Sequence, residues 1–312
     1  MDTNIPTPSE DAPAAPRIRS SELPEVEPDV ALYEPPAPRQ IDENTPLSSL
    51  SQAEIDQLTE KLLNDPSTRN KLIAEITPIS TLRAEYEAGS QSFVRQLDWL
   101  AEHGYNAFRR AARDGNCFYR SVAFSYLNRL LHAPNIPAAV ERFRGVLMSK
   151  ELSLTLAFED DIHKEFAEPL HTLMALVNDF GIAITSEDLL DRLLEVSDHV
   201  SYYFRLLASA EIRTNPDPYH DFIPDQDIIA FCQSQVEAVN SEVDHIPMMA
   251  LCNALRITLK VATLSSHGQG PVQESDLFTV ISPDDAMDKD LPPILLLFRP
   301  GHYDILLGPS SD

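Results

Sequence analysis

Cys117 is the residue of this sequence best suited to act as a nucleophile. It follows the turn-forming run Asp114-Gly115-Asn116, with Gly115 expected at a φ that other residues resist, and it opens a stretch of apolar residues at helical spacing. We expect Asp114 or Asn116 to cap that helix, which leaves Cys117 in its first turn. Unpaired N–H groups and the positive end of the helix dipole there favour a thiolate and could hold an oxyanion. The alternative is a small apolar cysteine packed at a helix start.

His302 and Asp304 are the residues best suited to serve such a nucleophile as base and orienting acid. The segment from Ile294 to Leu307 predicts a buried strand, a Pro-Gly turn and a second strand. Residues two apart in a strand project from the same face, so Asp304 can fix the tautomer of His302 and stabilise its cation. Gly301, directly before the histidine, leaves room for a substrate backbone. The alternative is a solvent-bonded histidine with an edge-strand charge, which a polar pair inside an apolar strand disfavours.

These motifs resemble those of a known family. Asp114 to Arg120 (DGNCFYR) and Arg299 to Leu306 (RPGHYDIL) are similar to otubain motifs, and residues 203–209, 221–223 and 244–246 are similar to otubain segments in the same order. The resemblance covers about residue 78 to residue 308. Otubains are cysteine proteases of the ovarian-tumour (OTU) class that cleave ubiquitin from conjugates.

The resemblance implies a role for each matching residue. Cys117 would be the nucleophile, His302 the general base, Asp304 its orienter, and Asp114 part of the loop that shapes the oxyanion site. Backbone N–H groups around Asp114 to Cys117, which include Gly115 and Asn116, would hold the oxyanion, and a channel beside Gly301 would admit the thin diglycine end of ubiquitin. This chemistry needs no metal or organic cofactor. The implied partners are ubiquitin and polyubiquitin, and the implied fold is an α+β papain-like cysteine protease.

Two other functions and one other base stay open at this point. The same fold could be a module that binds ubiquitin or a ubiquitin-conjugating enzyme without cutting. A transglutaminase or an acyltransferase with a thioester donor would also use Cys, His and Asp, but would not explain the segments between the motifs. Asp244 and His245 form a second acid–histidine pair. Sequence neighbours point in different directions on regular elements, so we expect this pair to start a helix instead.

The sequence predicts a tail, an arm and one catalytic domain. Residues 1–46 hold ten prolines and ten acidic residues against three basic ones, which is typical of a disordered tail. Residues 47–80 are expected to form a helical N-terminal arm, with a second helix over Leu72, Ile73 and Ile76 that ends at Pro78. Residues 81–312 would form the catalytic domain, mostly helical, with a small late sheet that carries the histidine.

Composition excludes several classes of protein. A formal charge of −25 argues against nucleic acid and anionic membrane surfaces as partners, and favours a basic partner. No apolar run approaches the length of a membrane span, and the N-terminus does not have the pattern of a secretory signal. Three cysteines without a C-x-x-C pair indicate a reducing compartment and no zinc site. We therefore expect the protein in the cytosol, the nucleus or both.

Overall fold

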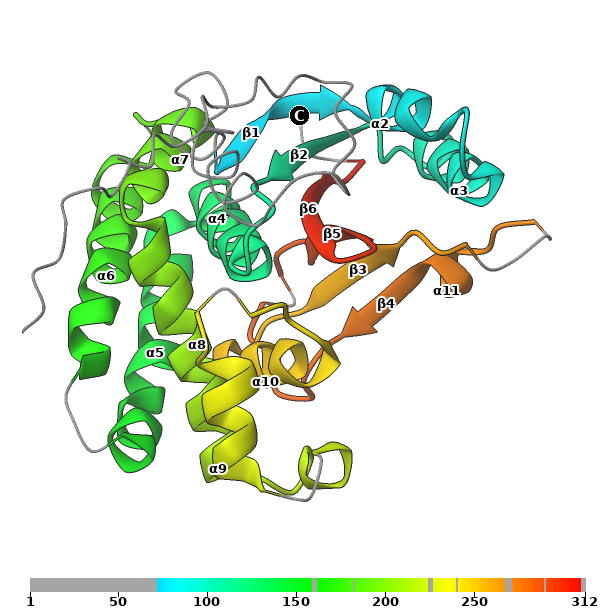
Figure 1. The fold of residues 1–312 in the computed structure, drawn as a ribbon. Helices are drawn as coiled ribbons and strands as arrows, with labels where there is room; N and C mark the ends of the chain where they lie inside the picture. The colour runs from blue at the N-terminus through cyan, green and yellow to red at the C-terminus, as the bar shows by residue number, and fades with distance from the viewer. Residues whose placement is uncertain are drawn as a thin grey trace, which may run out of the picture. The chain divides into compact units, whose positions relative to one another are not determined.

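A six-stranded mixed sheet is the central layer of the fold (Figure 1). The computed structural model describes residues 72–158, 162–181, 183–223, 227–239, 241–266, 271–288 and 290–309, all within the unit Leu58–Asp312. The strands are β1 (Ile73–Pro78), β2 (Ala107–Ala111), β3 (Leu259–Thr263), β4 (Phe278–Ile281), β5 (Ile294–Arg299) and β6 (His302–Leu307). They lie in the order β1-β2-β6-β5-β3-β4, and only β3 and β5 pair in parallel.

A large helical layer covers one face of the sheet. Its helices are α4 (Cys117–Leu131), α5 (Ile136–Ala157), α6 (Ile162–Phe180), α7 (Ser186–Glu195), α8 (Ser197–Thr214) and α10 (His245–Leu255). Leu296 on β5 and Ile305 on β6 belong to the core cluster that these helices form. The short elements are η2 (His220–Phe222), α9 (Ile228–Phe231), the π-helical η4 (Cys232–Val236) and α11 (Glu274–Leu277). Within the described ranges, no helix is both long and apolar enough to span a membrane.

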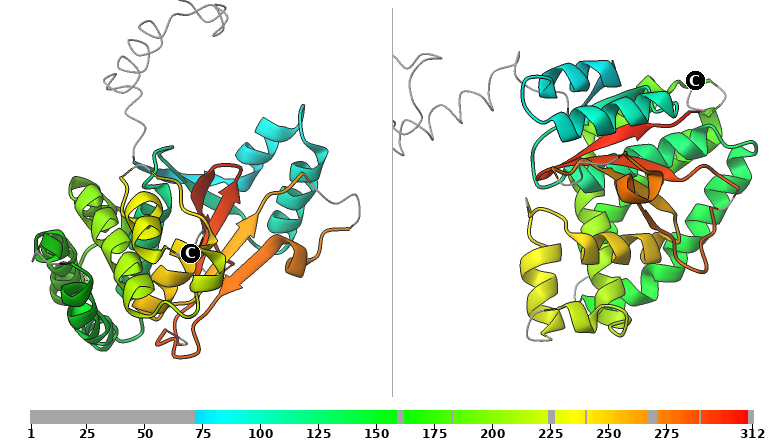
Figure 2. Two further views of the ribbon diagram at one scale, coloured as in Figure 1. Left: turned by 60° about the horizontal axis from the view of Figure 1, so that its bottom comes forward. Right: turned by 90° about the vertical axis from the view of Figure 1, so that its right-hand side faces the viewer.

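A smaller pair of helices, α2 (Ile79–Tyr86) and α3 (Gln91–Glu102), covers the other face (Figure 2). Successive strand residues point to opposite faces. Leu297 and Leu306, the neighbours of Leu296 and Ile305, accordingly pack in the second cluster with Leu82 of α2 and Leu100 of α3. The amphipathic pattern of α3 is confirmed, and Gly104, at φ 88°, follows its end. The central strands β5 and β6 are thus buried on both sides, and the two faces of the sheet meet different helices.

The sequence interpretation of the early chain needs correction. Residues 73–78, expected as a helix, form the edge strand β1, and β2 was not expected at all. The sheet is therefore not confined to the late chain, because two early strands extend it through the pairing of β2 with β6. The apolar residues around Ile73 fit either period, and pairing with β2 decides for the strand. The tail of residues 1–46 and the arm up to residue 71 lie outside the described residues.

Candidate active site

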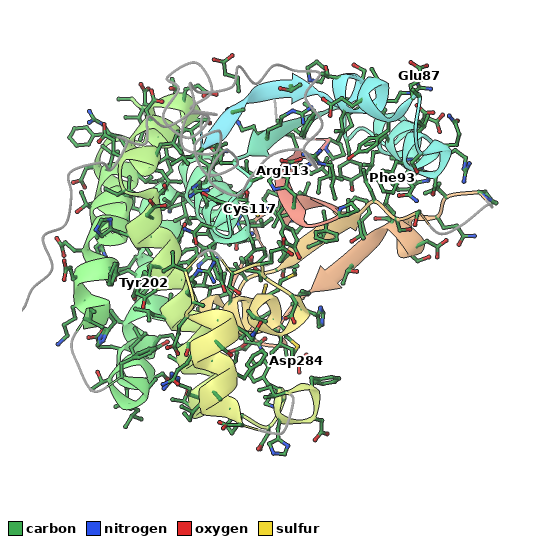
Figure 3. All side chains as sticks on the ribbon, in the orientation of Figure 1. Glu87, Phe93, Arg113, Cys117, Tyr202 and Asp284 are labelled. Atoms are coloured by element: carbon green, nitrogen blue, oxygen red, sulfur yellow. The ribbon has the colours of Figure 1, made fainter. Side chains whose placement is uncertain are left out.

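Cys117 is the first residue of α4 and lies where that helix meets the sheet (Figure 3). A tight turn precedes it, in which the Asp114 N–H donates to the Ala112 carbonyl at 2.9 Å and the Cys117 N–H donates to the Asp114 carbonyl at 3.2 Å. The side chain is mostly buried, with 8% of the residue exposed. The predicted position of the thiol at a helix start is therefore confirmed.

The expected helix cap is wrong. Neither Asp114 nor Asn116 caps α4 with its side chain. Asp114 Oδ1 instead accepts from the Asn116 N–H at 3.1 Å, and both of its oxygens accept from the Arg120 guanidinium at 2.9 Å. Asn116 Oδ1 accepts from Arg205. The two side chains are occupied by arginines, so the first-turn N–H groups next to Cys117 receive no side-chain cap from them. Gly115 is not at positive φ, which corrects a second expectation.

Arg205 of α8 holds the turn before Cys117 in place. This fully buried guanidinium donates to the Gly115 carbonyl at 2.7 Å and to Asn116 Oδ1 at 3.1 and 3.3 Å. It also donates to the carbonyls of Val236 and Ser241, each at 3.0 Å. Arg205 therefore ties the loop of the nucleophile to the segment that leads into α10.

His302 and Asp304 lie together at the start of β6. Gly301, at φ 70°, forms the turn from β5, a backbone angle that favours glycine. The imidazole Nε2 and Asp304 Oδ1 are 2.9 Å apart, and both side chains are almost fully buried. The Ala111 N–H at the end of β2 donates to the same oxygen at 3.1 Å. The predicted base–orienter pair therefore has hydrogen-bonding geometry, and β2 contributes to it.

Cys117 acts on the His302 ring together with Asp304. The ring nitrogen that does not contact Asp304, Nδ1, is buried and has no nitrogen or oxygen partner among the described residues. Burial lowers the pKa of His302, but hydrogen bonding to Asp304 and Cys117 and their negative charges outweigh it and raise this pKa to about 9. Burial likewise raises the pKa of Asp304, yet its hydrogen bond to His302 and the charge of Arg299 leave it below the ordinary value. The arrangement favours an imidazolium bonded to the Asp304 carboxylate.

The candidate residues from the sequence thus gather in one place, and the alternative pair of Asp244 and His245 has another role. Cys117, His302 and Asp304 come together from α4 and β6, beside the loop of Asp114. Asp244 instead caps α10 by accepting from the Ile246 N–H at 3.1 Å, which confirms the expected helix start.

Three buried arginines were missed by the sequence interpretation: Arg120, Arg205 and Arg299. Each bonds a polar group of the site, namely Asp114, the Gly115–Asn116 turn and Asp304 respectively. For Arg205, the signal that could have found it is a basic residue among the apolar side chains of a helix, Phe204, Leu206 and Leu207.

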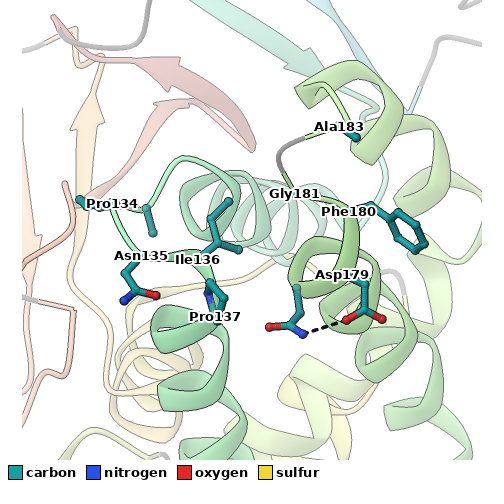
Figure 4. Close-up of a pocket in the computed structure, with 10 residues that line it drawn as sticks. Pro134, Asn135, Ile136, Pro137, Asp179, Phe180, Gly181 and Ala183 are labelled. Atoms are coloured by element: carbon teal, nitrogen blue, oxygen red, sulfur yellow. Dashed lines mark hydrogen bonds between the residues drawn. The ribbon is translucent and has the colours of Figure 1, made fainter.

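A cavity of about 400 Å³ lies apart from these residues. It is lined by residues 133–137, which join α4 to α5, and by residues 178–181 and 183 at and after the end of α6 (Figure 4). Two of its lining residues bond each other, since the Asn178 side chain donates to Asp179 Oδ1 at 2.8 Å. Neither Cys117 nor His302 lines it, so the cavity is not part of the candidate active site.

Known proteins are similar to this chain over most of its length. The family model described as Peptidase C65 Otubain matches residues 65–308. The ovarian tumor domain-containing deubiquitinating enzyme 1 of Arabidopsis thaliana is 32% identical over 255 residues, which are 77% of this chain and 81% of that protein. Ubiquitin thioesterase OTUB2 of Homo sapiens is 31% identical over 241 residues, 77% of this chain and 96% of that protein.

A solved structure agrees at the level of the fold. In the complex of h/ceOTUB1 with ubiquitin aldehyde and UBC13~Ub, a chain superposes with a TM-score of 0.67 at 24% identity, and the match covers 82% of this chain and 96% of that one. This likeness supports the α+β papain-like fold. The family model, which spans both Cys117 and His302, shows that the chain belongs to the otubain family of peptidases.

Proposed function

We propose that this otubain hydrolyses the peptide or isopeptide bond after the C-terminal glycine of ubiquitin, in conjugates or in polyubiquitin chains. The relatives named deubiquitinating enzyme and ubiquitin thioesterase support ubiquitin as the substrate class. The single observation that carries the mechanism is the 2.9 Å contact of His302 with Asp304 beside a cysteine at a helix start. The pair supplies an oriented base for that nucleophile.

Each residue of the site has a step in this reaction. The Cys117 thiolate attacks the terminal glycine carbonyl, and the resulting oxyanion accepts from backbone N–H groups of the first turn of α4 after Cys117, because those of Asn116 and Cys117 are already bonded to Asp114. The intermediate collapses to a thioester on Cys117 as His302 gives its proton to the departing lysine amine. His302 then takes a proton from water, which attacks the thioester and releases the ubiquitin carboxylate. Asp304 keeps the imidazole oriented throughout.

The approach to Cys117 suits a thin substrate tail. Gly301 is exposed and places no side chain beside His302. A side chain there would be strained by the positive φ and would approach Glu242, because an added Cβ would lie 3.4 Å from its Oε1. The two glycines that end ubiquitin likewise carry no side chains, so both surfaces can come close.

A ubiquitin carrying a C-terminal propargyl amide tests this proposal. The wild-type chain should gain the mass of one ubiquitin, whereas Cys117→Ala should gain none. Cys252→Ser is the matched control, because it removes another buried cysteine and should leave the reaction intact. Cys117→Ala and Cys117→Ser should also abolish cleavage of ubiquitin chains without changing the unfolding temperature. An adduct on Cys117→Ala, or none on the wild type, would refute the assignment.

Binding of a ubiquitin-conjugating enzyme is a second candidate function. The solved complexes in which OTUB1 occurs with UBC13~Ub or UBCH5B~Ub favour it. Such binding would not need the thiol. We therefore expect UBC13~Ub to bind the Cys117→Ala variant with the wild-type dissociation constant, measured by interferometry. Binding that disappears with the thiol would contradict this second function.

A further inference from the structure

Among the described residues, Arg299 is the charged group that bonds the carboxylate oxygen of Asp304 not used by His302. Its Nε donates to Asp304 Oδ2 at 2.8 Å, and a second guanidinium nitrogen lies 2.6 Å from the same oxygen. Both side chains are at most 4% exposed. The two oxygens of the Asp304 carboxylate therefore have different partners. Oδ1 bonds His302 and the Ala111 N–H, and Oδ2 accepts from Arg299.

The strand register fixes this division. Arg299 pairs with His302 across the β5–β6 hairpin, and Leu297 pairs with Asp304. Arg299 and Asp304 are thus diagonal neighbours on the face that also carries Leu297 and Leu306, where α2 packs. Tyr86 at the end of α2 bonds Arg299 and, like Asp304, raises its pKa against the effect of burial. The guanidinium is held from two sides and stays charged.

The charge of Arg299 bears on what His302 must do. A buried carboxylate and a thiolate both favour the imidazolium, and a base held only between them would bind its proton too tightly to pass it to a leaving amine. We propose that Arg299 is a positioning residue that acts through Asp304: it fixes the carboxylate with Oδ1 toward His302 and offsets part of its charge, so that the imidazole can release its proton. This inference rests on the proposed thiol-protease function.

The other charged groups around the pair do not replace Arg299. Cys117 faces the ring from α4 and adds negative charge. Glu242 and Asp244, from the segment before α10, lie near enough to Tyr303 to raise its pKa, after the larger effect of burial, and both are negative. Apart from His302, Arg299 is the only cation that bonds Asp304 among the described residues.

Carboxymethylation of Cys117 by iodoacetate tests the inference without ubiquitin, so a failure of ubiquitin hydrolysis would leave the test valid. In this reaction the Cys117 thiolate displaces iodide from the reagent. The imidazolium attracts the anionic reagent, so the reaction rate should fall as His302 loses its proton, near pH 9 in the wild type. This fall at high pH is the alkaline limb of the pH–rate profile. Burial raises the pKa values of Cys232 and Cys252, so both thiols should stay protonated and should not react with iodoacetate. The labelled peptide is quantified by mass spectrometry from pH 5 to pH 10.5.

Arg299→Gln should move this alkaline limb to higher pH by about one unit, because the negative charge of Asp304 is then no longer offset and holds the proton on His302 more tightly. The same variant should lower ubiquitin turnover about tenfold. Arg299→Lys keeps the charge and should leave the limb in place. A purely structural role would lower the rate with an unmoved limb, and that result would overturn the proposal.

If Arg299→Gln does not fold, two variants in which position 304 is neutral test the same inference. Asp304→Asn leaves Arg299 unbalanced beside the imidazole, so its limb should lie below that of the wild type. Asp304→Asn combined with Arg299→Gln removes that charge and should bring the limb back up, while the two amides can still bond each other. Coincident limbs for the single and double variants would show that His302 does not sense Arg299.

Discussion

Asp304 and His302 have unequal tasks at the residue scale. The imidazole moves the proton, whereas Asp304 orients the ring and stabilises its cation. An amide at position 304 could still accept from Nε2, so Asp304→Asn should lose less turnover than His302→Ala in a fluorogenic ubiquitin C-terminal amide assay. Unfolding temperatures provide the control for structural damage. An equal loss in the two variants would contradict this ranking.

The raised pKa of His302 also makes stability depend on pH. The folded chain holds this proton more tightly than the unfolded chain, with a pKa of about 9 against 6.5. The contribution is therefore complete below about pH 6.5 and is lost as the pH rises toward 9. Urea unfolding at pH 6, 7.5 and 9 should show a decline in the wild type that is smaller in His302→Gln. An identical decline in both chains would assign the effect to other groups.

At the scale of elements, the turn before α4 depends on a buried ion pair. Arg120 has no exposed side-chain area, and Asp114 satisfies it with two bonds of 2.9 Å. Asp114→Asn keeps the shape but removes the charge, so it should lower the free energy of unfolding by about 2 kcal/mol. Turnover should fall as well, because the oxyanion-binding N–H groups follow this turn.

Asp198 offers a matched control for that prediction. It bonds the same guanidinium at 3.2 Å, but 77% of its side chain is exposed. Asp198→Asn should therefore cost about 0.5 kcal/mol or less in urea unfolding. If the two variants lost the same stability, burial would not be what gives the Asp114 bond its strength.

Helices and strands differed in how far the sequence could predict them. The amphipathic pattern of α3 and the Asp244 cap of α10 were correct because a helix makes its hydrogen bonds within one segment. Strands β1 and β2 were missed because each is short and is completed by partners elsewhere in the chain, β2 by β6 about 200 residues later. The role of Arg205 was missed for the same reason, because its partners Gly115 and Ser241 are distant in sequence.

At the scale of the whole molecule, net charge should steer association with ubiquitin. The chain carries −25, and residues 47–312 alone carry 39 acidic against 21 basic residues. An acidic surface attracts a basic partner, and salt screens that attraction. Raising NaCl from 50 to 500 mM should therefore lower kcat/KM for ubiquitin substrates several-fold.

The uncharged reagent iodoacetamide provides the control for this salt effect. Its reaction with Cys117 needs no charged encounter and should change little over the same salt range. A chain without residues 1–46 should keep most of the effect, since it retains most of the net charge. A kcat/KM that does not fall with salt would show that surface charge does not set the encounter rate.

The sequence by itself determined a thiol at a helix start and an acid two residues after a histidine in a strand, because each depends only on local spacing. The otubain resemblance connected these two local motifs. Only the tertiary structure decided which groups complete them: β2 supplies an N–H to Asp304, and arginines from α4, α8 and β5 occupy Asp114, Asn116 and Asp304. Those partners are set by packing between distant segments, and a buried polar group bonds whichever partner the fold brings within reach.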